Sequence, residues 1–251
     1  MLPNKIFVRD FSGNVPGLTL IGGRKANTMR RTLVIGDIHG CYDELISLLD
    51  KAGFGADDQA VAVGDLIVKG SKNREVLDLF MSDSRFSSVI GNHDLAILNF
   101  WQGRSTSLKS SQKRTCDELE MYKERYTAYL SSLPFVIDLG SHAVVHAGVR
   151  PGIALSQQSP EDLVEIRTLG ADRTSREGTP WYEVYDDAKV ILFGHWPGPK
   201  PKVFEHAIGL DTGCVYGYQL TGYILETGEF LSVSAREQYD APSRRLGGDP
   251  Q

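Results

Sequence analysis

The chain has few cysteines, no long apolar run and no excess of positive charge. Its 251 residues include only three cysteines, Cys41, Cys116 and Cys214. These are too few and too scattered for a disulfide framework or a cysteine-ligated zinc site, so we expect packing residues in a reducing compartment. No stretch approaches the roughly 18 apolar residues of a membrane span, and the first 30 residues lack the apolar core of a secretory signal.

Charge and composition limit the possible partners. The formal net charge is −5 and the pI is near 5.7, so no overall basic field exists to hold nucleic acid or an anionic membrane. With 41% hydrophobic and 24% charged residues, the composition is that of an ordinary globular protein, for which one domain is the default. We therefore expect an intracellular, cytoplasmic protein with no membrane partner.

The two ends of the chain differ from its middle. The basic stretch at 22–32 is compatible with a transit peptide, but the GLTLIGG before it is typical of a strand and a turn. We therefore favour a partly ordered N-terminal extension, 1–30, over a targeting sequence. We assign 31–235 to the folded domain and 236–251 to a flexible tail.

Short strands alternate with amphipathic helices in the first half of the domain. Three β-α units are predicted, with strands and helices at 31–37 and 42–54, 60–65 and 71–83, and 87–94 and 95–101. In the first helix Leu45, Ile46, Leu48 and Leu49 are expected on one face, and Gly53 is the stop signal. Three successive units of this kind indicate an α/β fold, a mainly parallel sheet with helices packed on it.

The second half is rich in strands. A polar helical insert at 103–132 comes first, and we expect it to cover the rim of a site. After it, 135–148 and 218–235 have the pattern of hairpins, the second turning near Thr227 and Gly228, and 188–195 reads as a buried strand.

Polar side chains stand beside glycine wherever a predicted parallel strand ends. Asp37 and His39 lie in GDIHG, Asp65 in GDLIVKG and Asn92 in GNHD. Because loops at the carboxyl ends of neighbouring parallel strands converge on one crevice, we expect these side chains to meet. Two histidines occupy similar places, His146 in VVHAG and His195 in LFGHWPG, whereas His142 and His206 lack this context and are assigned to structure or surface.

These residue types together favour a metal centre. Any single motif is as compatible with a structural turn as with a ligand, but five strand-end motifs in one chain favour a shared site. Carboxylate, amide and imidazole groups suit Mn²⁺, Fe²⁺, Zn²⁺ or Co²⁺ better than Mg²⁺. Two ions roughly 3.5–4 Å apart can clamp the attacking and leaving oxygens of a displacement at phosphorus.

The motifs GDIHG, GDLIVKG, GNHD, HAG and GH resemble those of the metallophosphoesterases of the phosphoprotein phosphatase superfamily, over about 31–235. GLDTGCVYGYQLTGY at 209–223 is similar to the symmetrical diadenosine tetraphosphatases and the ApaH-like phosphatases. The resemblance implies a calcineurin-like double β-sheet sandwich flanked by helices (αββα). It also implies a set of ligands for two divalent ions: Asp37, His39 and His195 on one, Asn92 and His146 on the other, and Asp65 bridging. His93 would be the catalytic acid.

The chain departs from the resembling protein phosphatases at two positions. They carry GDxVDRG, in which an aspartate supports the catalytic histidine and an arginine holds phosphate, whereas this chain has Val68 and Lys69. Lysine is a compact point charge without the bidentate fork of arginine, and it is similar to the residue of the ApaH-like branch. Arg167 matches a second phosphate-binding arginine. We expect Lys69, Arg167 and Asn92 to bind phosphate, and we consider a role for Asp94 in orienting His93.

Three functions remain open on the sequence. The favoured one is a metal-dependent phosphohydrolase that splits diadenosine tetraphosphate into two ADP, with capped RNA and polyphosphate as further substrates. The alternatives are a serine/threonine protein phosphatase and a regulatory module with a dead site, and the full set of ligand types argues against the latter. Four aromatic residues could stack on a purine, although core packing is the more usual role of any one: Trp101, Trp181, Tyr216 and Tyr218. The oligomeric state is not predicted.

Overall fold

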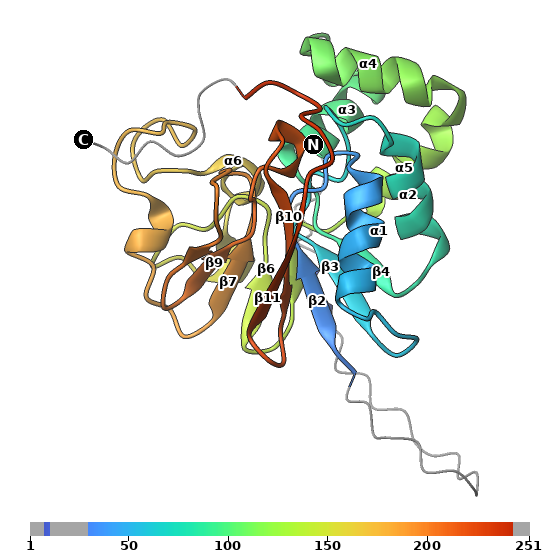
Figure 1. Cartoon of the computed structure of the whole chain (residues 1–251). Coiled ribbons are helices and arrows are strands. Elements are labelled where there is room, and N and C mark those ends of the chain that lie inside the picture. Colours follow the sequence, from blue (N-terminus) through green and yellow to red (C-terminus); the bar gives the residue numbers. More distant parts are fainter. Residues whose placement is uncertain (1–7, 11–29, 243–251) are drawn as a thin grey trace, which may run out of the picture.

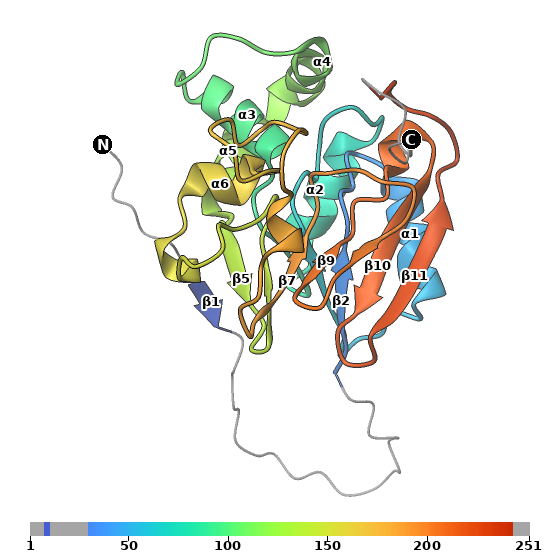
Figure 2. The same cartoon turned by 90° about the vertical axis from the view of Figure 1, so that its left-hand side faces the viewer.

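The computed structural model describes residues 8–10 and 30–242, which form two β-sheets stacked face to face with helices outside them (Figures 1 and 2). The strand expected in GLTLIGG lies outside the described residues. The double sheet confirms the fold class that the motifs implied.

The first sheet contains the three predicted parallel strands. Its order is β11-β10-β2-β3-β4. Strands β2, β3 and β4 run parallel, whereas β10 is antiparallel to both β2 and β11. The strands are β2 Thr32–Ile35, β3 Gln59–Ala62, β4 Phe86–Ser88, β10 Gln219–Ile224 and β11 Glu229–Ser234. The predicted hairpin is therefore confirmed, and its turn contains Gly228 with a φ of 71°.

The second sheet is mixed and has the order β1-β5-β6-β7-β9-β8. Its parallel pairs are β1 with β5, β6 with β7 and β7 with β9, and its antiparallel pairs are β5 with β6 and β8 with β9. The strands are β1 Val8–Asp10, β5 Val136–Asp138, β6 His142–Val144, β7 Val190–Phe193, β8 Lys202–Val203 and β9 Ala207–Gly209. A single, mainly parallel sheet is thus too simple a description. The hairpin at 135–148 and the strand within 188–195 are present.

Apolar side chains fill the space between the sheets. They come from the inward faces of both sheets and are mostly β-branched, which suits a pleated, half-buried surface. The buried members are Val34, Val61, Val63, Val89, Ile137, Val144, Leu192, Ile208, Leu210 and Tyr223. This inner core holds the carboxyl ends of β2, β3, β6 and β7 against one another.

The helices cover the outer faces, as Figure 1 shows for α1 and α2 beside the first sheet. Helix α1 buries Leu45, Leu48 and Leu49 as predicted, whereas Ile46 is only partly buried. Gly53 follows the helix, and its φ of 57° suits the residue after a helix end. The α-helices are α1 Tyr42–Lys51, α2 Asn73–Ser82, α3 Asn92–Trp101, α4 Ser110–Leu119, α5 Lys123–Ser132 and α6 Pro160–Glu165. Short 3₁₀ helices are η1 Glu120–Tyr122, η2 Leu155–Gln157, η3 Trp181–Glu183 and η4 Cys214–Tyr216.

Helix α3 begins earlier than the sequence pattern suggested. We expected it from 95, but Asn92, His93 and Asp94 form its first turn. The GNHD motif is therefore part of a helix rather than of the loop before it. This start fixes the backbone of Asn92 and His93 against the end of β3, because the N–H of His93 donates to Asp65 Oδ1 at 2.9 Å.

The chain after β11 returns to the body of the protein. The N–H of Arg236 and the hydroxyl of Tyr239 both donate to Glu44 Oε1 at 2.8 Å. The N–H groups of Tyr239 and Asp240 donate to the carbonyl of Val215. The first residues of the segment that we assigned to a flexible tail are thus held against α1 and η4, and the segment from 243 onward lies outside the described residues. Among the described helices, none has the length and apolarity to span a bilayer.

Candidate active site

The six expected metal ligands converge at one end of the double sheet. They follow β2, β3, β6 and β7 or begin α3, so both sheets contribute: Asp37, His39, Asp65, Asn92, His146 and His195. All are buried except Asn92, which is partly exposed. Loops at the ends of parallel strands thus bring together side chains that are far apart in the sequence.

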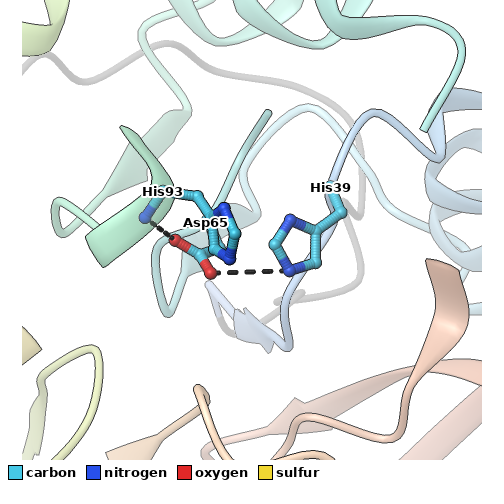
Figure 3. A group of neighbouring side chains, drawn as sticks. All are labelled: His39, Asp65 and His93. Carbon is cyan, nitrogen blue, oxygen red and sulfur yellow. Dashed lines mark hydrogen bonds and ion pairs between the residues drawn. The ribbon is translucent and has the colours of Figure 1, made fainter. Parts of the chain in front are cut away.

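Asp65 lies at the centre of this cluster. Its Oδ2 is 3.4 Å from Nε2 of His39 and 3.6 Å from Nε2 of His146, so one carboxylate oxygen stands between two imidazoles. Figure 3 shows the carboxylate directed toward His39 while its other oxygen accepts the N–H of His93. This position, between the two halves of the site, suits the bridging role expected of Asp65.

Asn92 lies between His146 and His195. Its Oδ1 is 2.9 Å from His146 Nε2 and 2.9 Å from His195 Nδ1. We expected His195 beside Asp37 and His39, but only its backbone reaches Asp37, through an N–H that lies 3.1 Å and 3.2 Å from the two carboxylate oxygens. The ring of His195 stands with Asn92 and His146, and the expected grouping is corrected accordingly.

Backbone carbonyls orient two of the imidazoles. His39 Nδ1 lies 3.1 Å from the carbonyl of Ile67, and His146 Nδ1 lies 2.9 Å from the carbonyl of Val63. An imidazole that donates from Nδ1 to a carbonyl carries its lone pair on Nε2, and these Nε2 atoms face Asp65. This tautomer would leave each Nε2 free to bind a cation.

Burial controls the protonation of the cluster. It raises the pKa of Asp65 to about 7, and burial followed by the charges of Asp211 and Asp65 raises that of Asp37 well above its usual range. Burial lowers the pKa of His146 to about 4, and it also lowers those of His39 and His195. Neutral imidazoles beside buried carboxylates favour the uptake of cations, which would stabilise the ionised carboxylates.

The donor set fits two divalent ions. It offers carboxylate oxygens, an amide oxygen and imidazole nitrogens, and His195 Nε2 is buried without a hydrogen-bond partner among the described residues. A buried nitrogen with no partner costs about 1–3 kcal/mol. Two groups of side chains bring potential ligand atoms within 4.8 Å of one another: His39, Asp65 and His93, and Asp37, Asp65 and His146.

Lys69 reaches the cluster from a strained turn. Val68 and Lys69 have φ values of 81° and 77°, a left-handed conformation that is a true outlier for a β-branched valine. The N–H of Val68 donates to Asn73 Oδ1 at 2.8 Å, which holds the turn. Lys69 Nζ consequently lies 3.1 Å from His39 Nε2 and 5.1 Å from the ring centre of Tyr216. Burial lowers the pKa of Lys69, but the interactions with Tyr216 and Asp65 raise it by more. The net pKa is therefore above the usual value, and the ammonium stays charged.

Arg167 belongs to the same end of the sheets. Its Nη1 donates to the carbonyl of Thr174 at 3.0 Å, and its Nε is buried without a partner within the described chain. Its charge contributes to the lowered pKa values of His195 and His93. Lys69 and Arg167, the two cations expected to bind phosphate, therefore both lower the pKa values of histidines in the cluster.

His93 and Asp94 follow each other in α3 but have different surroundings. The ring of His93 meets that of His39 edge to face at 5.1 Å between centroids, and its Nδ1 is buried without a partner among the described residues. Asp94 accepts the N–H groups of Gly91, Leu66 and Ile67 at 3.1–3.2 Å. The carboxylate of Asp94 thus ties α3 to the loop after β3 and makes no hydrogen bond to His93, contrary to the orienting role considered from the sequence.

Two glycines allow the strand ends to approach closely. A Cβ at Gly194 would overlap Oδ1 of Asp37, and a Cβ at Gly91 would overlap the backbone and carboxylate of Asp65. Glycine is needed at both positions because the side chain of a proposed ligand occupies that space.

Sequence reasoning missed Asp211. This carboxylate follows β9, is 6% exposed and contributes to the raised pKa of Asp37. Its Oδ1 accepts the N–H of Gly213 at 3.0 Å. The signal was weak, since GLDTG places Asp211 between two glycines, each two residues away, and β9 is too short to be recognised from its pattern.

The aromatic residues divide into two groups. Trp101, the last residue of α3, is buried in the core, and Trp181 is fully buried and donates from Nε1 to the carbonyl of Ala147 at 3.1 Å. These two cannot stack on a base. Tyr216 is half-buried beside Lys69, so it lies at the cluster, unlike Trp101 and Trp181. His142, on β6, and His206, 3.7 Å from Glu205, lie outside the cluster as expected.

The chain is similar to known phosphohydrolases over most of its length. Residues 30–225 match the model of the calcineurin-like phosphoesterase family. A bis(5'-nucleosyl)-tetraphosphatase PrpE of Bacillus velezensis, named asymmetrical, is 29% identical over 83% of this chain and 94% of its own length. A bis(5'-nucleosyl)-tetraphosphatase of Vibrio campbellii, named symmetrical, is 28% identical over 76% of this chain and 93% of its own length.

Solved structures agree with this likeness. A crystal structure described as a candidate diadenosine tetraphosphatase has a TM-score of 0.70 at 29% identity and covers 83% of this chain and 95% of its own. A serine/threonine phosphatase from Saccharomyces cerevisiae has a TM-score of 0.58 at 17% identity, covering 86% and 83%, which shows the fold alone. With its double sheet and its cluster of carboxylate, amide and imidazole side chains, the chain belongs to the calcineurin-like phosphoesterase family, as a metal-dependent phosphohydrolase.

Proposed function

We propose that the protein hydrolyses diadenosine tetraphosphate to two ADP with the help of two divalent ions. The observation that carries the proposal is the position of Lys69, whose charged Nζ is held against the His39 and Asp65 side of the cluster. The names of the similar tetraphosphatases support this substrate class. Capped RNA and polyphosphate share its chain of phosphates and are the next candidates.

The residues divide between the two ions according to their contacts. Asp37 and His39 would hold one ion, Asn92, His146 and His195 the other, and Asp65 both. The ions, when bound, supply Lewis acidity at phosphorus and acidify a water molecule. They are Mn²⁺, Fe²⁺, Zn²⁺ or Co²⁺, because imidazole and amide ligands favour first-row metals.

The chain's own cations and acid act on the substrate. Lys69 and Arg167, with the amide of Asn92, bind phosphate oxygens and offset the negative charge that develops in the transition state. His93 protonates the leaving ADP oxygen. A chain of four phosphates offers further oxygens beside the one attacked, which a point charge such as Lys69 can bind without bidentate geometry.

A protein phosphatase is the weaker reading. The resembling protein phosphatases hold a single phosphate with an arginine fork and support their catalytic histidine with an aspartate. Here Lys69 replaces the arginine and the buried Val68 replaces the aspartate. The likeness to the yeast phosphatase extends to the fold only.

A substrate panel tests the proposal. The purified chain with Mn²⁺ or Co²⁺ is assayed on diadenosine tetraphosphate, capped RNA, polyphosphate and phosphopeptides, with products separated by ion-exchange chromatography. We expect two ADP, with label from ¹⁸O water on a phosphate next to the central bridging oxygen. ATP and AMP as products would show that cleavage is asymmetrical and would contradict the proposed symmetrical reaction. Faster turnover of phosphopeptides would overturn the nucleotide proposal.

Replacing Lys69 tests the role of its charge. Lys69→Ala should lower kcat/KM for diadenosine tetraphosphate by about tenfold to a thousandfold, equal to roughly 1.4–4 kcal/mol of transition-state stabilisation. Lys72→Ala is the matched control, because Lys72 lies three residues on but pairs with Asp43 at 2.8 Å. Equal losses in both variants would remove Lys69 from the substrate site.

A further inference from the structure

A second cluster of metal-ligating side chains lies behind the loops of the active site. Cys41, Glu44 and Cys214 each place one ligand atom within 4.8 Å of the others. Their exposures are 1%, 1% and 2%, so all three side chains are buried. Cys41 precedes α1 and Glu44 lies in its first turn, whereas Cys214 begins η4, so the fold joins two distant parts of the sequence.

Glu44 has one oxygen with partners and one without. Oε1 accepts the N–H of Arg236 and the hydroxyl of Tyr239, both at 2.8 Å. Oε2 is buried and has no hydrogen-bond partner among the described residues. An orphaned buried carboxylate oxygen is costly, because folding removes the water that would otherwise solvate it. A cation shared with the two sulfurs would satisfy it.

The ligand types define the ion. Two cysteine sulfurs with one carboxylate oxygen suit Zn²⁺, which binds thiolate and carboxylate in tetrahedral sites, better than Mg²⁺ or Mn²⁺. Contrary to the packing role expected from the sequence, we propose that Cys41, Cys214 and Glu44 bind one Zn²⁺, separate from the two ions proposed for the active site. Each thiol releases its proton to solvent as its sulfur binds, and a water molecule completes the four ligands.

The position of this zinc site gives it a structural effect. Cys41 lies two residues after His39, and its Sγ is 3.9 Å from the His39 carbonyl. Cys214 lies two residues before Tyr216, which contacts Lys69. A zinc ion would therefore connect the loop after β2 to η4 and brace both against α1. The site does not depend on the proposed substrate, since it is built from residues with no assigned catalytic role.

Cobalt reports this site alone. The full chain, reduced and freed of metal, is titrated with Co²⁺ while the near-ultraviolet spectrum is recorded. Only thiolate ligands give the intense sulfur-to-cobalt charge-transfer band, and the residues assigned to the active site offer nitrogen and oxygen only. We expect a band with the intensity of one thiolate-bound cobalt per chain, while cobalt bound by the active-site residues adds nothing to it. The band should be displaced by Zn²⁺ and lost in Cys214→Ser.

Two further variants make the result decisive. Cys116→Ser should keep the band, because Cys116 lies in α4 outside the cluster. Glu44→Gln should weaken Zn²⁺ binding at least tenfold with the far-ultraviolet circular dichroism unchanged, and it decides the matter if Cys214→Ser does not fold. No band in the native chain, a band unchanged in Cys214→Ser, undiminished affinity in Glu44→Gln, or a Cys41–Cys214 disulfide in its place would overturn the proposal. None of these readouts requires enzyme activity.

Discussion

His93 combines a proposed acid role with a low proton affinity. Burial lowers its pKa well below the usual value, and the charges of Lys69, Lys109 and Arg167 lower it further. A neutral imidazole is a very weak acid, so efficient protonation of the leaving oxygen requires the imidazolium form of His93. The negative phosphate chain of a bound substrate would offset these cations and raise the pKa of His93, so we expect its imidazolium form only when substrate is bound.

Substitution of His93 should therefore depend on the leaving group. We expect His93→Ala to lower turnover of diadenosine tetraphosphate by about a hundredfold to ten-thousandfold, the usual contribution of general acid catalysis. Hydrolysis of an aryl phosphate, whose leaving group needs no proton, should fall much less, and the bound metal should stay. His142→Ala is the control, since His142 lies on β6 away from the cluster. Equal losses on both substrates would mean that His93 only positions the site.

Gly194 should be as necessary as the ligand it contacts. Gly194→Ala places a methyl group onto the carboxylate of Asp37 and should displace it, so that metal content and activity fall together while the fold remains. Gly170→Ala is a matched control, because a Cβ there meets nothing within 4 Å. Metal analysis by mass spectrometry measures the difference. A Gly194→Ala protein with full metal content would show that Asp37 is not needed to hold an ion.

At the scale of elements, the strongest patterns were predicted and the short ones were not. The three β-α units were recognisable because each strand is a buried apolar run followed by a helical stripe. Strands β8 and β9 have two and three residues, too few for any periodicity, so the place of Asp211 after β9 was missed. The second sheet followed from the resemblance rather than from the pattern, because pairing between distant strands leaves no local signal.

The candidate site shows the same limit. Glycines and ligand-type residues after strands indicated which side chains converge, and the structure brings all six together. The grouping of His195 could not be derived, because the distance from its ring to Asn92 depends on how the two sheets stack. A catalytic role was considered for Asp94 because it follows His93 in the sequence. Adjacent residues of a helix point in different directions, however, so the two side chains need not touch.

An ion pair between Arg31 and Asp58 joins the residue before β2 to the residue before β3. Asp58 accepts from the backbone, Nε and Nη2 of Arg31 at 2.6–3.2 Å and from the N–H of Gly55 at 2.8 Å. Burial raises the pKa of Asp58, but these hydrogen bonds outweigh it and hold the pKa below the usual value. The ionised form is therefore favoured by folding.

This interaction should make stability depend on acid pH. Because the pKa of Asp58 is lower in the folded state, its contribution is present above about pH 4 and is lost as the pH falls through the folded value. Asp58→Asn should lower the free energy of unfolding by about 1–2 kcal/mol at pH 7, allowing for the partial exposure of Arg31, and by less below pH 4. Urea unfolding measures both. Asp57→Asn, at an exposed neighbour, should change little, and a pH-independent difference would contradict the argument.

At the scale of the whole molecule, the active-site ions should stabilise the fold. Three buried carboxylates, Asp37, Asp65 and Asp211, lie at one end of the sheets, and their pKa values are raised by burial. An ion that binds only the folded chain adds about 2.7 kcal/mol at a hundred times its Kd. For a chain of this size that is about 5–10 °C in Tm.

Removal of metal tests this expectation. Calorimetry with Mn²⁺ and then with excess chelator should show a Tm lower by about 5–10 °C after chelation. Asp65→Asn should lose most of the difference, whereas Asp138→Asn, at a surface pair with Lys189, should keep it. An identical Tm with and without Mn²⁺ would show that the cluster does not hold the ion in the folded state.

The turn at Val68 and Lys69 has a consequence for how the protein can evolve. Five described non-glycine residues have a positive φ, namely His39, Asp65, Val68, Lys69 and His195, and every one lies in a loop of the active site. At about 1–3 kcal/mol each, the strain is comparable with the whole stability of an ordinary domain. Selection for heat resistance would find its largest gains by relaxing these loops, and each gain would move a proposed ligand or Lys69. Adaptation to higher temperature is therefore confined to the sheets, the helices and the outer loops, and the loops of the active site set a limit on the stability that an active descendant can reach.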